Sequence, residues 1–270
     1  MSKMQQRIKN ILPESIWNVA REGWDSLHRL GEWREATFHP WRRDSIRRLA
    51  VLKDSRKGER CFIIGNGPSL KHTDLSKLRD EYTIGMNRIF LLFPELGFTT
   101  NYFVSINDLV IEQSANDIQN LSMPVFVSWR ARRWLKPQEN LYFLYTTYTG
   151  PGFGRDVRKR LWEGATVTYV ALQLAFYLGF EQVILIGVDH NFVTQGRPNT
   201  TIVSEGDDPN HFSPAYFGKG FRWQLPDLET SERAYRMAKT AYESAGRQVL
   251  DATVGGKLTV FPKVDYESLF

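Results

Sequence analysis

The sequence predicts an α/β fold: a doubly wound, mainly parallel (Rossmann-like) sheet with helices on both faces, preceded by a helical arm. Short apolar runs alternate with segments of helical spacing, and polar loops follow the apolar runs, a pattern typical of βαβ units. The 270 residues are 42% hydrophobic and 24% charged, which excludes collagen-like and wholly disordered classes. Cys61 is the single cysteine, so an intrachain disulfide is excluded and a reducing compartment is expected.

Residues 1–57 are predicted to form a helical, basic arm. Apolar side chains recur at helical spacing after Pro13, and Gly31 is the expected end of that helix. Eight basic and three acidic residues lie between Trp41 and Arg60, a net charge of +5 that equals the charge of the whole chain. The apolar stripe can pack on its own domain, on a second subunit or on an anionic membrane surface. A solvated helix face is the simpler explanation of the basic segment, and contact with anionic lipid is the alternative.

No stretch of the sequence is apolar enough to span a membrane, and the first ten residues lack the apolar run of a secretory signal. We therefore expect a cytoplasmic protein, with peripheral contact of the arm on the inner membrane face as a further option. A homo-oligomer formed through the arm is the other option, and no nucleic-acid partner is expected.

Residues 58–270 are predicted to form the Rossmann-like domain. Continuously apolar runs are typical of strands buried on both faces of a parallel sheet, and they occur at 61–64, 82–86, 102–106, 125–128, 141–145, 182–186 and 247–251. Helical patterns at 168–179 and 228–246 precede the last two runs. The segment 191–227 is rich in Gly, Pro, Asn and Asp and has no clear periodicity, so we expect a lid-like loop.

A glycine-rich turn follows the first predicted strand and consists of Gly65, Asn66, Gly67, Pro68 and Ser69. Such a turn lets a ligand approach the backbone closely, and amide groups ahead of a helix suit a phosphate. The turn is neither a dinucleotide fingerprint nor a P-loop, because it lacks the third glycine of the first and the Gly-Lys-Ser/Thr of the second. A purely structural tight turn is the alternative.

Polar residues also end three later strands: Asn87, then Asn107 with Asp108, then Asp189 with His190. Carboxyl ends of parallel strands meet at one edge of the sheet, which is where ligands bind in open α/β folds. Any one of these residues could be a turn-former, but four polar strand ends together predict a polar ligand site. Neutral amides can contact a base or a ribose as well as a phosphate.

These motifs resemble a group of bacterial proteins with two branches. The order Gly-Asn-Gly-Pro-Ser-Leu at 65–70, Asn87, and Leu-Gly-Phe-Glu-Gln-Val-Ile-Leu-Ile-Gly-Val-Asp at 178–189 is similar to the sialyltransferases that use CMP-activated sugars, glycosyltransferase family 42. The stretch 210–258, with Asn-His-Phe, Tyr-Phe-Gly-Lys-Gly and Ala-Thr-Val-Gly-Gly-Lys-Leu, is similar to the DUF115 family, which includes the 6-hydroxymethylpterin diphosphokinase MptE-like proteins. The resemblance covers roughly residues 59–266.

The sialyltransferase pattern implies roles for individual residues. Asn66 and Asn87 would face the nucleotide phosphate and the transferred sugar, and Asn107 would face the sugar or ribose. A cytidine pocket would be lined by Thr166, Thr168, Gly187 and Asp189. His211 falls where those enzymes place a histidine general base. Those enzymes carry tyrosines just after the Gly-Ile/Val-Asp motif, whereas here His190 and Asn191 follow it, so stabilisation of the leaving group is expected from His190, Tyr216 or Lys219.

The leading hypothesis is a cofactor-independent glycosyltransferase that transfers a nonulosonic acid from a CMP-activated donor to a surface polysaccharide or a protein. The alternative is a 6-hydroxymethylpterin diphosphokinase that uses ATP, for which Mg²⁺ is needed and for which Asp189, Asp207 and Asp208 are the candidate ligands. A nucleotide-binding scaffold without turnover is the third hypothesis.

Overall fold

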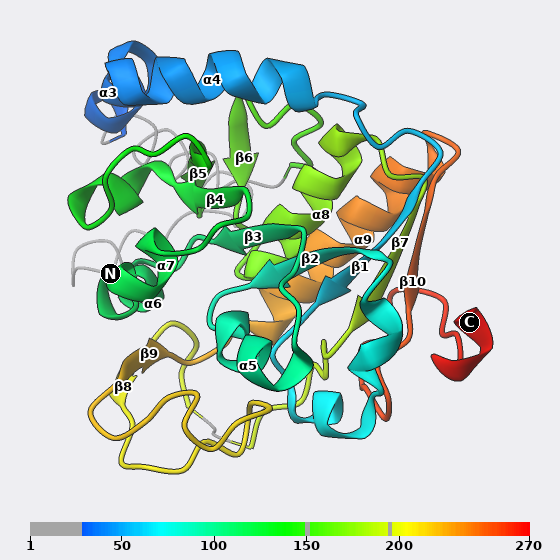
Figure 1. The fold of residues 1–270 in the computed structure, drawn as a ribbon. Helices are drawn as coiled ribbons and strands as arrows, with labels where there is room; N and C mark the ends of the chain where they lie inside the picture. Colours follow the sequence, from blue (N-terminus) through cyan, green and yellow to red (C-terminus); the bar gives the residue numbers. More distant parts are fainter. Residues whose placement is uncertain (1–28, 149–151, 194–195) are drawn as a thin grey trace, which may run out of the picture.

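The computed structural model describes residues 29–148, 152–193 and 196–270. Its large sheet consists of β1 (Arg60–Ile64), β2 (Tyr82–Met86), β3 (Tyr102–Ser105), β4 (Val125–Ser128), β5 (Leu141–Thr147), β6 (Arg160–Trp162), β7 (Gln182–Ile186) and β10 (Gln248–Asp251). All neighbouring pairs are parallel, in the order β10-β7-β1-β2-β3-β4-β5-β6 (Figure 1). The predicted fold class and its seven apolar strands are therefore confirmed, whereas β6 was not predicted.

The strand order reverses between β1 and β7. The chain adds strands outward from β1 to β6, and then returns to place β7 on the opposite side of β1. The two strands are in register, with Ile64 opposite Ile186. In an open α/β sheet the loops that leave the carboxyl ends at such a reversal diverge, and ligands bind between them.

Two long helices cover one face of the sheet, as Figure 1 shows. In α8 (Val167–Leu178) every residue from Thr168 onward is buried, because the helix is apolar on all sides and lies between the sheet and α9 (Leu228–Glu243). Alternate residues of β1 pack on opposite faces: Cys61 and Ile63 join the cluster of α8 and α9, while Phe62 and Ile64 join the cluster on the other face.

Short helices connect the remaining strands. The α-helices are α5 (Phe93–Leu96), α6 (Asp108–Gln113) and α7 (Ala115–Gln119), and the 3₁₀ helices span Pro68–His72, Leu75–Leu78, Ile89–Leu92 and Trp129–Arg133. A further 3₁₀ helix, Glu267–Leu269, follows the last strand. No helix among the described residues is long and apolar enough to cross a bilayer.

Two further helices, α3 (Leu30–Phe38) and α4 (Pro40–Leu52), belong to the predicted arm. The helix end predicted at Gly31 is wrong, because α3 begins one residue earlier and continues; most of the predicted first helix lies outside the described residues. α4 packs on β5 and on α8: Ser45 Oγ accepts the amide of Phe143 in β5 at 3.1 Å, and Tyr177 Oη in α8 donates to the Leu49 carbonyl at 2.9 Å. This half of the arm is thus joined to the sheet, and contact with a subunit or a membrane stays a prediction.

The segment predicted as a loop contains a two-stranded antiparallel sheet, β8 (Thr201–Val203) and β9 (Arg222–Gln224). Phe217 stacks on Phe221 and Trp223, with ring centroids 4.9 and 5.3 Å apart. Gln113 of α6 holds β9, because its side chain donates to the Arg222 carbonyl and accepts the Arg222 amide, both at 2.8 Å. The segment therefore has a structured core of its own.

Candidate functional site

A pocket of about 570 Å³ lies at the carboxyl ends of the central strands, on both sides of the strand reversal. The predicted site residues that line it are Gly65, Asn66, Gly67, Asn87, Asn107, Asp108, Thr166, Thr168, Gly187, Asp189, His190 and His211. Within the described part of the chain, the predicted residues outside its lining are Pro68, Ser69, Tyr216, Lys219, Asp207 and Asp208. Most of the residues that were predicted as a ligand site, because they lie at the carboxyl ends of strands, thus line one pocket.

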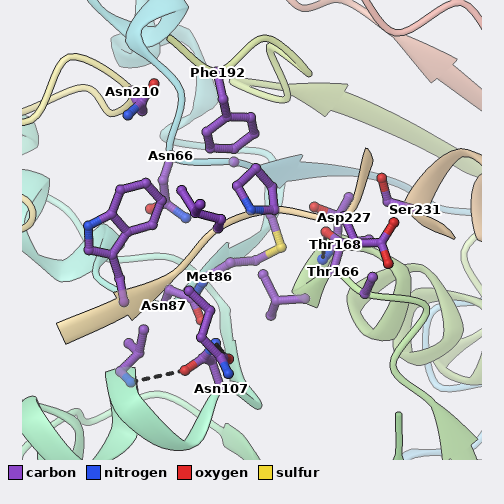
Figure 2. A pocket seen from close by; sticks show the side chains of 18 of the residues that line it. Asn66, Met86, Asn87, Asn107, Thr166, Thr168, Phe192, Asn210, Asp227 and Ser231 are labelled. Atoms are coloured by element: carbon purple, nitrogen blue, oxygen red, sulfur yellow. Dashed lines mark hydrogen bonds between the residues drawn. The ribbon is translucent and has the colours of Figure 1, made fainter. Parts of the chain in front are cut away.

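The pocket has two chemically different sides, which Figure 2 shows from close by. Three amides, Asn66, Asn87 and Asn107, lie on one side. The other side is formed by the N-terminal ends of α8 and α9 and carries hydroxyls and a carboxylate from Thr166, Thr168, Asp227 and Ser231. This lining can form hydrogen bonds to a polyhydroxylated or heteroaromatic ligand from both sides.

Unusual backbone conformations are concentrated at this pocket. Five described residues other than glycine have a positive φ, and four of them line the pocket: Asn87 (52°), Ala165 (59°), His190 (53°) and Asn199 (63°). The left-handed region is sterically unfavourable for residues with a Cβ atom, and such strain is concentrated at active sites and ligand sites. The backbone therefore points to the same site as the side chains.

The glycine-rich turn is bound to the end of β7. Gly65 N donates to the Ile186 carbonyl at 2.7 Å, and Gly67 N donates to the Gly187 carbonyl at 2.9 Å. Ser69 donates its amide and its hydroxyl to the two carboxylate oxygens of Asp189, at 3.1 and 2.7 Å. These amides, which were expected to face a phosphate, thus already have protein acceptors.

The buried position of Asp189 is electrostatically unfavourable for its ionised carboxylate. Burial raises the pKa of its carboxyl group, and the two bonds from Ser69 oppose that rise only in part. The carboxylate therefore acts as an internal anion that fills the amide-lined end of the turn.

The amide side chains also have bonds within the protein. Asn107 Oδ1 caps α6 by accepting the amide of Leu109 at 2.9 Å, and Asn87 Oδ1 accepts the hydroxyl of Ser105 at 3.1 Å. Asn66 differs, because its Oδ1 atom is buried and has no partner among the described residues. Its main-chain carbonyl accepts the amide of Phe212 at 2.9 Å, which ties the 191–227 segment to the turn.

His211 forms a pair with a buried carboxylate. Its Nδ1 atom lies 2.7 Å from Oδ2 of Asp208, whose side chain is 3% exposed. The imidazole stacks on the ring of Tyr216, with centroids 4.0 Å apart and planes 6° apart. Asp208 and Tyr216 therefore fix the orientation of the ring, and Nε2 has no partner among the described residues. This is the arrangement of a general base that is oriented by a third group.

Tyr216 and Lys219 do not reach the pocket from their positions after His211. The Tyr216 side chain is buried; its hydroxyl accepts the amide of Arg88 at 3.3 Å, and burial raises its pKa. Lys219 is exposed. Tyr216 thus stacks against one face of the His211 imidazole from outside the pocket.

A second histidine, His190, forms a similar pair with a residue of α9. Its Nε2 atom lies 3.1 Å from Oε1 of Glu232, and Glu232 Oε2 also accepts Arg236 Nη2 at 2.9 Å. The imidazole meets the ring of Tyr235 edge-on, with centroids 6.2 Å apart. The pocket is therefore lined by two histidines, each held by a carboxylate.

Arg130 is a central residue of the site that the sequence analysis missed. Its Nε donates to Asp108 at 2.9 Å, its Nη2 to Glu163 at 2.7 Å and its Nη1 to the Thr146 carbonyl at 3.3 Å. Burial lowers the pKa of Arg130, but Glu163 and Asp108 more than offset this, and the net effect is a raised pKa. One guanidinium thus joins the ends of β3, β4, β5 and β6.

The three carboxylates considered for Mg²⁺ do not form a common site. Asp189 binds Ser69, Asp208 binds His211, and Asp207 is exposed outside the pocket. Across residues 29–148, 152–193 and 196–270, no three His, Cys, Asp or Glu side chains are grouped as metal ligands. These three residues therefore do not form the Mg²⁺ site that the diphosphokinase hypothesis requires.

Comparison with known proteins shows the family of this chain and a solved structure to which the chain is similar. A model of the family described as 6-hydroxymethylpterin diphosphokinase MptE-like matches residues 42–195. Among curated proteins, no sequence matches. Among solved structures, the chain is similar to the sialyltransferase CstII from Campylobacter jejuni in complex with a substrate analogue, cytidine-5'-monophosphate, with 15% identity and a TM-score of 0.45 over 77% of this chain and 85% of that chain.

Proposed function

The chain belongs to the 6-hydroxymethylpterin diphosphokinase MptE-like family, and we propose that it is a transferase in which His211 is the general base. The substrate that we propose is a CMP-activated sugar, a nonulosonic acid, and the acceptor is a hydroxyl group of a surface glycan or a protein. The observation that carries the proposal is the His211–Asp208 pair at the pocket.

Sugar transfer to a hydroxyl requires a group that accepts the hydroxyl proton as the new bond forms. His211 suits this role because Asp208 holds Nδ1 at 2.7 Å and leaves Nε2 as the proton acceptor. A buried carboxylate that fixes the ring also stabilises the imidazolium that results. A general base of this kind contributes about 10²- to 10⁴-fold to the rate.

The choice of donor rests on the motif resemblance and on the character of the pocket. The order of the glycine-rich turn, Asn87 and the motif that ends in Asp189 is similar to that of CMP-sugar transferases. The amide side of the pocket offers neutral donors and acceptors, which suit hydroxyl groups and a pyrimidine edge.

The test is release of CMP from a CMP-linked nonulosonic acid, with and without a glycan acceptor, in buffer containing EDTA. We expect acceptor-dependent release in the wild-type protein and stabilisation by free CMP in thermal denaturation without metal. Binding of CMP without turnover would support the scaffold hypothesis, and absence of both would overturn the proposal.

The diphosphokinase is the second candidate, because the family carries that description. It predicts transfer of pyrophosphate from ATP to 6-hydroxymethylpterin only with Mg²⁺ present. The same thermal assay separates the two candidates: stabilisation by ATP with Mg²⁺, and none by CMP, would replace the glycosyltransferase with the kinase. Product analysis by mass spectrometry after incubation with ATP and the pterin completes this test.

A further inference from the structure

The second histidine–carboxylate pair has no role in proton removal from the acceptor, yet it lies at the strand reversal. Resting on the proposed function, we infer that His190, held by Glu232, binds the phosphate group of the nucleotide and stabilises it as it departs. His190 directly follows Asp189 at the end of β7, and its φ of 53° turns the chain sharply there.

The glycine-rich turn does not supply this phosphate site. Its amides at Gly65 and Gly67 donate to carbonyls of the β7 end, and the Asp189 carboxylate accepts both donors of Ser69. A phosphate placed against these groups would meet the carboxylate of Asp189 instead of free donors, and like charges at close range repel. The negative charge must therefore be bound by another part of the pocket.

Arg130 does not supply the cationic group for the phosphate either. All three guanidinium nitrogens donate to protein acceptors, and the carboxylates of Asp108 and Glu163 exceed its charge. Among the described residues that line the pocket, the other side chains able to carry a positive charge are His190 and His211. Because His211 is assigned to the acceptor proton, His190 is the cationic group that is left for the phosphate.

The surroundings of His190 suit this role. Glu232 holds Nε2 at 3.1 Å and is itself held by Arg236 at 2.9 Å, so Nδ1 is the nitrogen without a partner among the described residues. The charged groups that face the imidazole are Glu232 and, paired with Glu232, Arg236, and Tyr235 contributes a ring edge from α9. In its protonated form, an imidazole held in this way donates a charge-assisted hydrogen bond from Nδ1 to a phosphate oxygen.

The two histidines then act on opposite ends of one displacement. The bond between the sugar carbon and the phosphate oxygen breaks, and its electron pair stays on the phosphate oxygen, where the imidazolium of His190 binds the new charge. A bond forms between the acceptor oxygen and the sugar carbon, and the acceptor proton moves to Nε2 of His211. Glu232 does not touch the substrate and is a positioning residue.

The experiment is calorimetric titration of the full chain with CMP and with cytidine, which differ by the phosphate alone. The variants are His190→Gln, whose amide nitrogen can still bind Glu232, Glu232→Gln, the double variant, and His72→Gln as a matched control. His72 is exposed and lies outside the pocket lining. We expect His190→Gln to weaken CMP binding about 10- to 100-fold, as loss of a hydrogen bond to a charged group predicts, and to leave cytidine binding unchanged.

Glu232→Gln is expected to weaken CMP binding about 3- to 10-fold while His190 is present, and to cause no further loss in the His190→Gln background. If His190→Gln weakened binding of CMP and cytidine equally, His190 would be a structural residue and the inference would be overturned. Equal binding of CMP and cytidine by the wild-type protein would also overturn it. A wild-type protein that binds neither ligand would overturn the proposed function itself.

Discussion

The carboxylate of Asp189 occupies the space that a side chain at Gly67 would need. A Cβ atom built on Gly67 would lie 1.7 Å from Oδ2 of Asp189, although the residue has an ordinary φ of −71°. Glycine is therefore required here by lack of space and not by backbone conformation. The contact joins the turn after β1 to the end of β7, which are the two loops that diverge at the strand reversal.

Replacement of Gly67 by alanine should destabilise the protein by about 1 to 3 kcal/mol, because overpacking forces the carboxylate or the turn to move. Urea denaturation measures the loss. Gly206→Ala is the matched control, since a Cβ atom there meets nothing within 4 Å. Equal stability of the two variants would show that the turn can shift away from Asp189.

Asp189 should also give the stability a recognisable dependence on pH. Burial raises the pKa of its carboxyl group in the folded chain. A raised pKa means that folding favours the protonated form, so its contribution is present below about pH 4 and is lost as pH rises through the folded-state pKa. Asp189→Asn stays uncharged and can still accept the Ser69 amide. We expect its stability relative to wild type to be higher at pH 7 than at pH 4 in urea titrations, and an unchanged difference would contradict this.

The fold could be predicted because its strands carry a strong local signal. Val125–Ser128 is buried along its whole length, so a continuously apolar run identifies it without any knowledge of its neighbours. β6 has one buried residue, Leu161, between two more exposed ones. Three residues of this kind contain no periodicity, and only their pairing with β5 makes them a strand.

The site could be predicted in part for the same reason. Asn87 directly follows the apolar run of β2, and Asp189 lies three residues after the end of β7. Both are therefore found by looking for polar residues at the ends of predicted strands. Arg130 lies in a Trp-Arg-Ala-Arg-Arg sequence that looks like a solvated basic segment, and its partners Asp108 and Glu163 are 22 and 33 residues away along the chain. Pairing of charges over such distances leaves no local pattern. An arginine two residues after the end of a buried strand was the available signal.

Arg130 should be one of the most sensitive residues for stability. Arg130→Met keeps much of the side-chain volume but leaves two carboxylates without their cation, and Glu163 is buried. Removal of one partner from a buried ion pair costs about 3 kcal/mol or more. Arg133→Met is the control, because Arg133 is exposed and lies 3.9 Å from Asp108, so its loss should cost under about 1 kcal/mol. Thermal denaturation of the two variants tests this ranking.

His211 can be tested by a substitution that separates its two nitrogens. His211→Asn retains a nitrogen at the position of Nδ1, which can donate to Asp208, and removes Nε2. We expect the rate of sugar transfer to fall by about 10²- to 10⁴-fold, with CMP affinity and melting temperature close to wild type. His211→Ala should lower the rate equally and also cost about 1 to 3 kcal/mol of stability, because the buried carboxylate of Asp208 loses a donor. Steady-state kinetics with denaturation of both variants measures the two effects. A His211→Asn variant that retains its rate would remove His211 from catalysis, even if both variants were destabilised.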